Sequence, residues 1–314
     1  MYGRILAEVF ALNGADNPIS QANYLQSLRP SAKLLWQAYR NQAVAVNYAA
    51  PAIQEAYLLR YFVPYSHLLP AVLRDLELKG IRVAAPDGLL TACFFGCGPG
   101  PEVAGLIRHL RQKAERPEML IARMFDVASA SWQHGRTIAK NSILTGDWDA
   151  ALMEIVPVVA DISANGLFSA NGGARHRIDD ADLIVFQNCL NELSTTALAS
   201  AANNLRALLI AAKRHTTFVL IERDGYGATD DMLRSLCQWA ATQSIAFTSV
   251  GDLSVASELN CRGMLDEVPE IMTKHLFVRK RDMTPILPEE SGLVLAASVK
   301  YKWLAISKQA PGAP

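Results

Sequence analysis

Short apolar runs alternate with longer amphipathic segments between residues 88 and 250, and this rhythm most constrains the fold. Five of the runs have the length and composition of buried strands, at 90–95, 119–125, 151–160, 182–187 and 217–222. Segments with helical spacing follow three of them, at 103–113, 196–213 and 230–242. Alternation of this kind predicts a mostly parallel sheet with helices on both faces, in a doubly wound α/β fold.

The first 80 residues differ in character from the remainder. Apolar side chains recur at helical spacing over 56–78, where Pro64 and Pro70 predict kinks or breaks. Seven of the nine tyrosines fall in the first 65 residues, at Tyr2, Tyr24, Tyr39, Tyr48, Tyr57, Tyr61 and Tyr65. The pattern predicts an N-terminal helical cap over 1–85, which acts as a substrate lid, and a second domain over 86–314.

The end of the chain contains β-prone pieces at 245–250, 275–279 and 294–306. We expect them to complete one edge of the sheet as an antiparallel extension. The stretch 252–270 is weakly patterned and is expected to be a lid or an insertion. The tetrapeptide Ser-Ala-Asn-Gly occurs twice within 163–173, which indicates a flexible loop.

Composition excludes several classes of protein. With 51% apolar and 19% charged residues in 314, the chain is not of the disordered type, and 30 basic residues balance 30 acidic ones. No apolar run is long enough for a membrane span, and Glu8 interrupts the N-terminal run, so no secretory signal is expected. The five scattered cysteines favour reduced thiols in a cytoplasmic protein, and they match no metal cluster, so no metal is expected.

Three glycines, Gly96, Gly98 and Gly100, stand where the first strand ends and a helix begins. Glycines in such a turn let a ligand approach the backbone, and the helix start offers free N–H groups. A nicotinamide-type G-x-G-x-x-G loop would need glycine where this chain has Pro101, so a nicotinamide oxidoreductase is disfavoured. The Gly-Lys-Ser/Thr of a phosphate-binding Walker loop is also missing.

The segment Gly96-Cys97-Gly98-Pro99-Gly100 resembles motif I of the class I S-adenosylmethionine-dependent methyltransferases, and Pro101-Glu102 suits the helix that follows it in that family. The resemblance covers about residues 88–250. It implies a Rossmann-like fold, S-adenosyl-L-methionine as cofactor, and methyl transfer as the activity. Phe94 departs from the pattern, because the family often has an acidic residue at this position.

The resemblance also implies the rest of the cofactor site. Asp126, at the end of the second strand, would accept hydrogen bonds from both ribose hydroxyls. Val127 would lie against the adenine, and Asp161 with Ile162 would border its amino group, although Asp161 is equally suited to a turn. The full set of implied cofactor residues is Gly96, Cys97, Gly98, Pro99, Gly100, Glu102, Asp126, Val127, Asp161, Ile162, Gln187 and Asn188.

A looser resemblance links 57–62 (Tyr-Leu-Leu-Arg-Tyr-Phe), the glycine loop and 191–193 (Asn-Glu-Leu) to the ribosome-associated methyltransferase-like family of the mitochondrial small subunit. It keeps RNA possible as the methyl acceptor. The balanced charge and the tyrosine-rich cap favour a small or planar molecule instead.

Glu192 and His134 are the candidate catalytic bases, because an oxygen or ammonium acceptor must lose a proton near neutral pH. A helix-start carboxylate and a surface histidine are the structural alternatives. Tyr57, Tyr61, Asn191 and Glu222 are the candidate acceptor contacts, although the two tyrosines could equally pack in a core.

Two functional hypotheses follow. The first is a methyltransferase that uses S-adenosylmethionine. The second is a catalytically inactive binding or scaffold protein with the same fold, which Phe94 favours.

Overall fold

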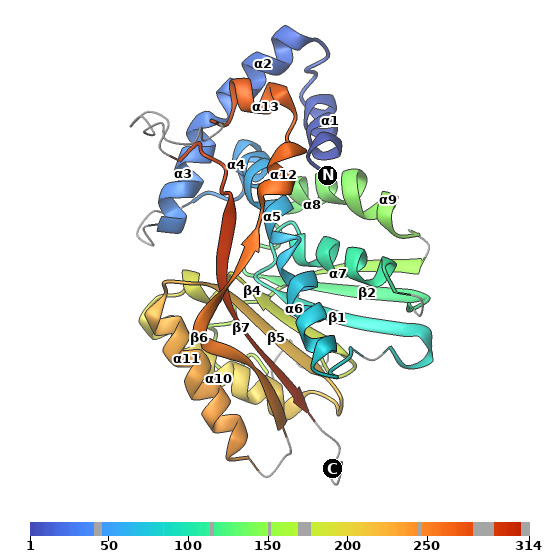
Figure 1. The fold of residues 1–314 in the computed structure, drawn as a ribbon, viewed down its shortest axis with the longest axis vertical. Helices are drawn as coiled ribbons and strands as arrows, with labels where there is room; N and C mark the ends of the chain where they lie inside the picture. Colours follow the sequence, from blue (N-terminus) through green and yellow to red (C-terminus); the bar gives the residue numbers. More distant parts are fainter. Residues whose placement is uncertain are drawn as a thin grey trace.

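The computed structural model describes residues 1–40, 46–83, 85–113, 116–149, 152–168, 177–243, 247–278 and 292–308. At its centre is a seven-stranded sheet with the order β3-β2-β1-β4-β5-β7-β6 (Figure 1). The strands are β1 (Leu89–Phe95), β2 (Met119–Asp126), β3 (Met153–Val159), β4 (Leu183–Gln187), β5 (Thr217–Arg223), β6 (Phe247–Asn260) and β7 (Ser298–Lys308). Strands β1 to β5 are parallel, and β7 runs antiparallel between β5 and β6.

The strand order reverses direction at β1 and β4, which are neighbours in the sheet. In doubly wound sheets, ligands bind outside the carboxyl ends of the strands at such a switch point. The sheet therefore places the ends of β1 and β4, with the residues that follow them, at the expected ligand crevice.

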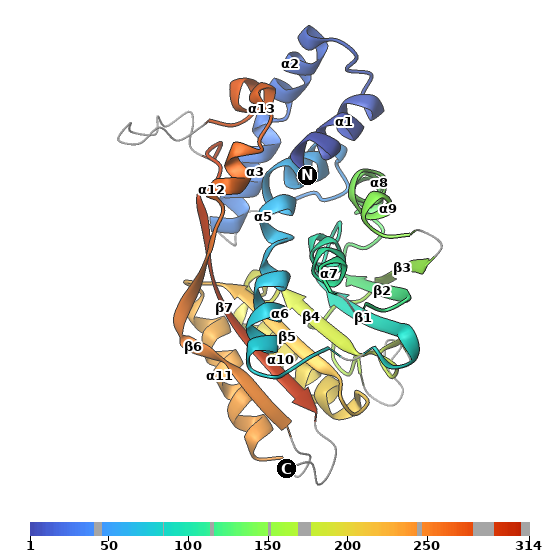
Figure 2. The same ribbon diagram turned by 45° about the vertical axis from the view of Figure 1, so that its right-hand side comes forward.

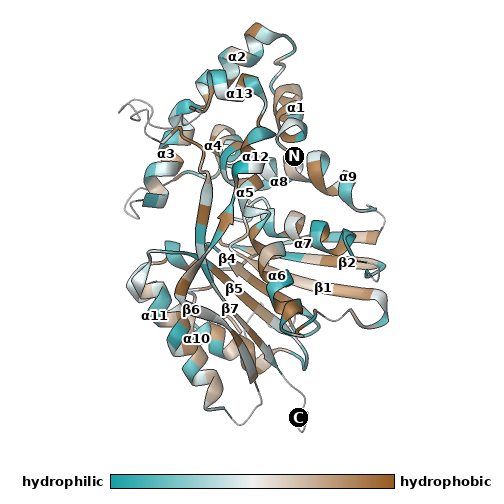
Figure 3. Cartoon of the chain, viewed as in Figure 1, coloured by the Kyte–Doolittle hydropathy of each residue, from teal (hydrophilic) through white to brown (hydrophobic). Residues whose placement is uncertain are grey.

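Helices cover both faces of the sheet (Figures 1 and 2), as the sequence predicts. The side chains of β1 alternate between two apolar cores. Phe94 points into the core with α6 (Leu68–Leu78) and α7 (Pro101–Arg111), whereas Phe95 points into the core with α10 (Thr195–Ala211) and α11 (Gly227–Ala241). Figure 3 shows the brown, apolar strands between these helices. Both faces are buried, which explains the near-continuous apolar strands.

The remaining helices form a layer beyond the carboxyl ends of the strands (Figure 1). They are α1 (Tyr2–Leu12), α2 (Pro18–Ser27), α3 (Arg29–Arg40), α4 (Pro51–Tyr57), α5 (Val63–Tyr65), α8 (Gln133–Ala139), α9 (Thr145–Asp147), α12 (Arg262–Asp266) and α13 (Glu270–His275). Helix α13 lies beside α2, where Gln26 Nε2 is 3.3 Å from His275 Nδ1. Segments from before and after the five parallel strands thus contribute to this layer. None of the described helices is long and apolar enough to cross a bilayer.

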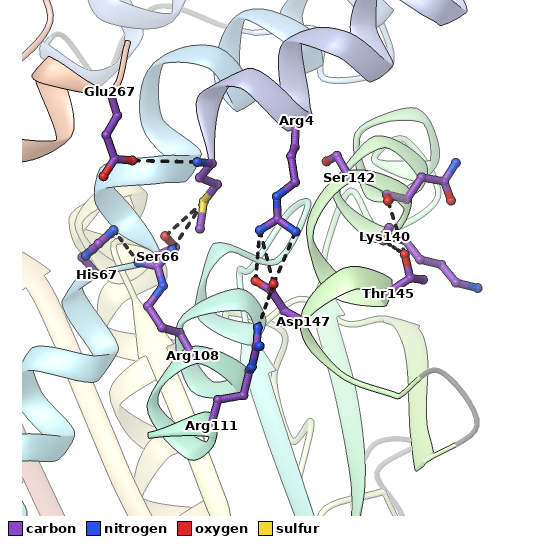
Figure 4. Close-up of polar contacts among 12 residues, drawn as sticks. Arg4, Ser66, His67, Arg108, Arg111, Lys140, Ser142, Thr145, Asp147 and Glu267 are labelled. Carbon is purple, nitrogen blue, oxygen red and sulfur yellow. Dashed lines mark hydrogen bonds and ion pairs between the residues drawn. The ribbon is translucent and has the colours of Figure 1, made fainter. Parts of the chain in front are cut away.

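An ion-pair cluster joins the N-terminal helix to the sheet-covering helices. Arg4 of α1 and Arg111 of α7 both bind the carboxylate of Asp147 in α9, at 3.2 and 3.0 Å (Figure 4). Each exposed pair contributes little alone. Their convergence on one carboxylate nevertheless fixes where α1 lies relative to the sheet.

Several predicted elements differ from the structure. Pro64 causes no break, because α4 continues through a π-helical turn (Leu58–Phe62) into α5, and this helical segment ends at Ser66. Pro70 lies in the first turn of α6, where the helix loses no hydrogen bond. The predicted loop at 252–270 is wrong: β6 continues to Asn260 across a register shift, and α12 follows it.

The predicted strand at 275–279 is also wrong. His275 ends α13, and Val278 forms an isolated bridge with Val294. The second Ser-Ala-Asn-Gly copy, residue 279 and residues 245–246 lie outside the described residues.

Candidate functional site

A cavity of about 360 Å³ opens at the carboxyl ends of β1, β2 and β4. The residues that line it come from the glycine loop, from the ends of four strands and from the N-terminal helical layer. They are Ala38, Tyr39, Val46, Tyr48, Tyr57, Tyr65, Phe95, Gly96, Gly98, Asp126, Val127, Ala128, Trp132, Ala160, Asp161, Ile162, Gln187, Asn188, Cys189, Asn191, Glu192, Leu193, Arg223 and Tyr226.

The glycine loop forms one wall of this cavity, and its backbone leaves no room for side chains. Gly96 has φ +62°, and a Cβ there would overlap the Cβ of Cys189. Gly98 has φ +49°, and a Cβ there would lie 3.0 Å from the ring of Trp132. Left-handed backbone of this kind favours glycine. Both glycines are therefore required for the loop to lie against the cavity.

Asp126 closes the loop from the end of β2. Its Oδ2 accepts a hydrogen bond from the Gly98 N–H at 2.9 Å, and its Oδ1 accepts one from the Ala128 N–H at 2.7 Å. Burial raises the pKa of this carboxyl, and the two N–H groups oppose that rise. Each carboxylate oxygen has a second lone pair, so Asp126 can still accept hydrogen bonds from a ligand.

The end of β4 brings unpartnered polar atoms to the cavity. Asn188 has φ +55°, and within the described part of the chain neither its Oδ1 nor its Nδ2 has a hydrogen-bond partner. Gln187 donates to Glu102 Oε1 at 3.2 Å and to the Tyr65 carbonyl at 3.2 Å, while its own Oε1 is unpaired among the described residues. Buried polar groups without partners are costly and point to a ligand that satisfies them.

Three stacked phenylalanines support the floor of the cavity. Phe95 lies between Phe125 and Phe186, with ring centroids 4.5 Å apart on each side. The three residues are register partners on neighbouring strands. Phe95 itself lines the cavity, so this stack gives the ligand site a rigid apolar base.

Aromatic side chains of the helical layer form the opposite wall. The rings of Tyr48 and Tyr57 lie 4.9 and 5.2 Å from Trp132. The buried side chain of Gln54 holds this wall, because it donates to the carbonyls of Tyr48 and Ser131 at 2.7 and 2.6 Å. The aromatic residues are thereby fixed relative to the glycine loop.

Two glutamates lie near the carboxyl ends of β4 and β5, and their roles differ. Glu222 is fully buried and accepts hydrogen bonds from the backbone N–H groups of Cys189, Leu190 and Asn191 at 3.0–3.3 Å, so it shapes this loop. Burial raises its pKa to about 7. Glu192 opens onto the cavity, and desolvation together with the charges of Glu222 and Asp126 raises its pKa to about 8.

Comparison with known proteins gives no family match, since no family model and no curated protein matches this sequence. Among solved structures, loganic acid methyltransferase with SAH is 10% identical, with a TM-score of 0.44 and coverage of 81% of this chain and 96% of that one.

Two further structures are similar to the same degree. The N-methyltransferase NodS from Bradyrhizobium japonicum WM9, in complex with S-adenosyl-L-homocysteine, is 14% identical with a TM-score of 0.39, and the match covers 79% of this chain and 89% of that one. A putative rRNA methylase from Clostridium thermocellum is 10% identical with a TM-score of 0.39, and the match covers 76% and 97%. Because these values are low, the function proposed below depends on the cavity itself.

The sheet order and the glycine loop agree with the predicted architecture. The sheet is the mostly parallel, doubly wound sheet that the sequence predicts. Eight of the residues implied by the methyltransferase resemblance line the one cavity, and they are Gly96, Gly98, Asp126, Val127, Asp161, Ile162, Gln187 and Asn188.

Four other residues implied by the methyltransferase resemblance lie behind the cavity wall, and they are Cys97, Pro99, Gly100 and Glu102. Gly100 caps α7, and Cys97 and Glu102 are buried. The carboxyl of Glu102 reaches the cavity only through Gln187, and burial raises its pKa well above the usual range. These residues shape the loop and do not line the ligand space.

Three predicted acceptor and catalytic residues are not brought to the cavity. His134 lies in α8, where its Nε2 is 2.8 Å from Glu55 Oε1. Glu222 is turned inward because β5 continues to Arg223. Tyr61 lines a second cavity, whereas Tyr57, Asn191 and Glu192 line the first. The positions of His134 after the second strand and of Glu222 in the fifth therefore did not predict contact with the first cavity.

Several lining residues were not predicted to be at the site, and they are Tyr39, Tyr48, Tyr65, Trp132, Arg223 and Tyr226. The concentration of tyrosines in the first 65 residues was the available signal for three of them. Asp161 accepts hydrogen bonds from Ser163 N and Oγ at 2.8 and 2.6 Å, so it also makes the turn considered as an alternative.

Proposed function

We propose that this chain is a methyltransferase that transfers the methyl group of S-adenosyl-L-methionine to a small acceptor molecule. One observation carries the proposal: the side-chain-free loop at Gly96–Gly98 and the Asp126 carboxylate are joined by a 2.9 Å hydrogen bond and face the same cavity. A ligand can approach the backbone of a loop that lacks side chains, and a carboxylate beside this loop can accept hydrogen bonds from two vicinal hydroxyls of that ligand.

The residues present fit S-adenosylmethionine. The free lone pairs of Asp126 would accept the ribose hydroxyls, and Val127, which is 68% exposed, offers an apolar surface for the base. The unpartnered amide of Asn188 supplies both a donor and an acceptor for an amino-acid group. When bound, the cofactor supplies an activated methyl group on a sulfonium.

Residues of this chain would then align the acceptor and remove its proton. Glu192 has a pKa of about 8, so its carboxyl is suited to accept a proton near neutral pH. The rings of Tyr48, Tyr57 and Trp132 exclude water and restrict the acceptor's orientation. Orientation and a dry site account for much of the rate in displacements of this type.

A small acceptor is favoured over RNA because the cavity is walled by aromatic side chains, and the chain has as many acidic as basic residues. We further propose that the helices of residues 1–85 act as the lid over the acceptor. The five cysteines are unpaired, which supports a cytoplasmic location.

The inactive-scaffold alternative depends on Phe94. This side chain is fully buried in the core with α6 and α7 and does not line the cavity. It therefore removes one cofactor contact that the family often has, while Asn188 offers another polar group at the cavity.

Isothermal titration calorimetry with S-adenosylmethionine and S-adenosylhomocysteine tests the proposal, with NADH as the control ligand. We expect both sulfur nucleosides to bind and NADH not to bind. Absence of binding by either nucleoside would overturn the proposal, and binding without turnover on a broad acceptor panel would support the scaffold instead.

A further inference from the structure

A second cavity, of about 500 Å³, lies against the first. Three residues line both spaces, and they are Tyr39, Tyr65 and Arg223. The proposed cofactor residues line only the first cavity. The second is formed by α3, by the π-helical turn at Leu58–Phe62 and by the beginning of β7. A molecule larger than the first cavity could therefore extend past this shared wall.

The second cavity is positively charged. Four of its lining residues are cationic, and they are Arg40, Arg60, Arg223 and Lys300. Its one acidic lining residue among the described residues, Asp224, lies 3.4 Å from Lys302, which also pairs with Asp230. Since the whole chain has equal numbers of basic and acidic residues, this excess is local. Such a cavity attracts an anion.

Three of the four cations either contact another group of the protein or are exposed to solvent. Arg60 donates to the carbonyls of Gly292 and Val294. Arg40 stacks 4.8 Å from the Trp36 ring centroid. Lys300 is exposed.

Arg223 differs from them. It is the last residue of β5 and is only partly exposed, and its guanidinium makes no hydrogen bond or ion pair with any other residue that the structure describes. A guanidinium held in a cavity wall without a counter-ion is a site for a carboxylate or similar oxyanion, which it can bind through two parallel hydrogen bonds.

The surroundings of Arg223 are aromatic. Tyr39 and Tyr61 meet edge to face with ring centroids 4.9 Å apart, and Tyr61 lies 5.6 Å from Tyr65. Tyr226 donates from its hydroxyl to the Tyr39 carbonyl at 2.7 Å, which ties the loop after β5 to α3. Rings fixed in this way suit the flat face of an aromatic ligand.

We propose that the methyl acceptor is an aromatic carboxylate, whose ring lies among Tyr39 and Tyr65 and whose carboxylate binds Arg223. This inference rests on the proposed methyltransferase function and adds the chemical class of its acceptor. With its carboxylate on Arg223, the acceptor would place its reacting atom in the first cavity, which Glu192 lines.

Calorimetry with 4-hydroxybenzoate and with its uncharged analogue 4-hydroxybenzamide tests this inference, in the presence of saturating S-adenosylhomocysteine. We expect the carboxylate to bind the wild-type protein about tenfold or more tightly than the amide. In Arg223→Gln, the affinity for the carboxylate should fall to that for the amide, whereas the affinities for the amide and for S-adenosylhomocysteine should not change. Arg234→Gln is the matched control, because Arg234 lies on α11 and lines neither cavity.

The outcomes separate the two proposals. If S-adenosylhomocysteine does not bind, the proposed function fails. If it binds but the two aromatic probes bind equally, or neither binds, the aromatic-carboxylate inference is overturned while the cofactor site stands. The wild-type comparison keeps the test decisive if Arg223→Gln does not fold, which thermal unfolding would reveal.

Discussion

The backbone N–H of Gly98 lies 2.9 Å from Oδ2 of Asp126, so the end of β2 holds the loop that follows β1. The two residues are 28 positions apart in sequence, but the strands that lead to them, β1 and β2, are parallel neighbours in the sheet. This bond both shapes the glycine loop and positions the carboxylate at the cavity.

Asp126→Asn should weaken S-adenosylhomocysteine binding by more than tenfold. The amide keeps the size of the side chain but loses the charge and one of the acceptor oxygens, and a hydrogen bond to a charged group contributes about 1.5–3 kcal/mol. Calorimetry measures the change. Asp231→Asn is the control, because Asp231 is exposed on α11 and pairs with Arg234 of the same helix. Equal affinity in the two variants would remove Asp126 from the cofactor site.

Gly96→Ala should destabilise the fold more than Gly14→Ala does, although both glycines have φ +62°. The shared φ costs about 1–2 kcal/mol in each variant. A Cβ at Gly14 has nothing within 4 Å, whereas a Cβ at Gly96 meets Cys189. We therefore expect an additional loss of about 1–3 kcal/mol at Gly96, measured by urea unfolding. Equal losses would show that the loop moves freely away from Cys189.

Glu222 should make the protein less stable as the pH rises from about 4.5 to 7. Its folded pKa of about 7 lies above the usual value of 4.5, so the folded state holds a proton that the unfolded state has released in this interval. Stability then falls with pH, by about 1–3 kcal/mol in total. Urea unfolding at pH 5 and pH 8 measures the difference, and Glu222→Gln should reduce it. A Gln variant with the wild-type pH dependence would assign the effect to another group.

Glu192→Gln should lower kcat by about 10²–10⁴-fold on an acceptor whose proton must be removed. Since the pKa of Glu192 is about 8, the wild-type rate should rise with pH up to about that value, and the variant should lose this rise. Affinity for S-adenosylhomocysteine should stay the same. His134→Gln is the control, because His134 contacts Glu55 and does not line the cavity. A larger loss in the histidine variant would contradict the assignment of Glu192.

The parallel sheet was predictable because each buried strand is a distinct apolar run, and even β3 was found despite Pro157, which lies within an edge strand. The glycine loop was predictable as a turn between a strand and a helix, and the role of Asp126 was implied by the methyltransferase resemblance. Only the beginning of β6 was predicted, at 245–250, because a register shift between Asp252 and Ser257 interrupts the alternation of this long strand.

The acceptor side of the site was less predictable. Tyr39, Tyr48 and Arg223 face the same space only after the helical layer has packed on the sheet, and no local pattern carries that information. Glu222 was misjudged because its environment depends on three N–H groups of a loop about 30 residues earlier.

The second cavity is lined by Tyr2 at one end of the sequence and by Lys300 near the other. During synthesis, its walls therefore cannot meet until Lys300 has been made. The glycine loop and its sheet neighbours β1, β2 and β4 are made by Gln187, more than a hundred residues before that point. The glycine loop and Asp126 are thus synthesised well before both walls of the proposed acceptor site.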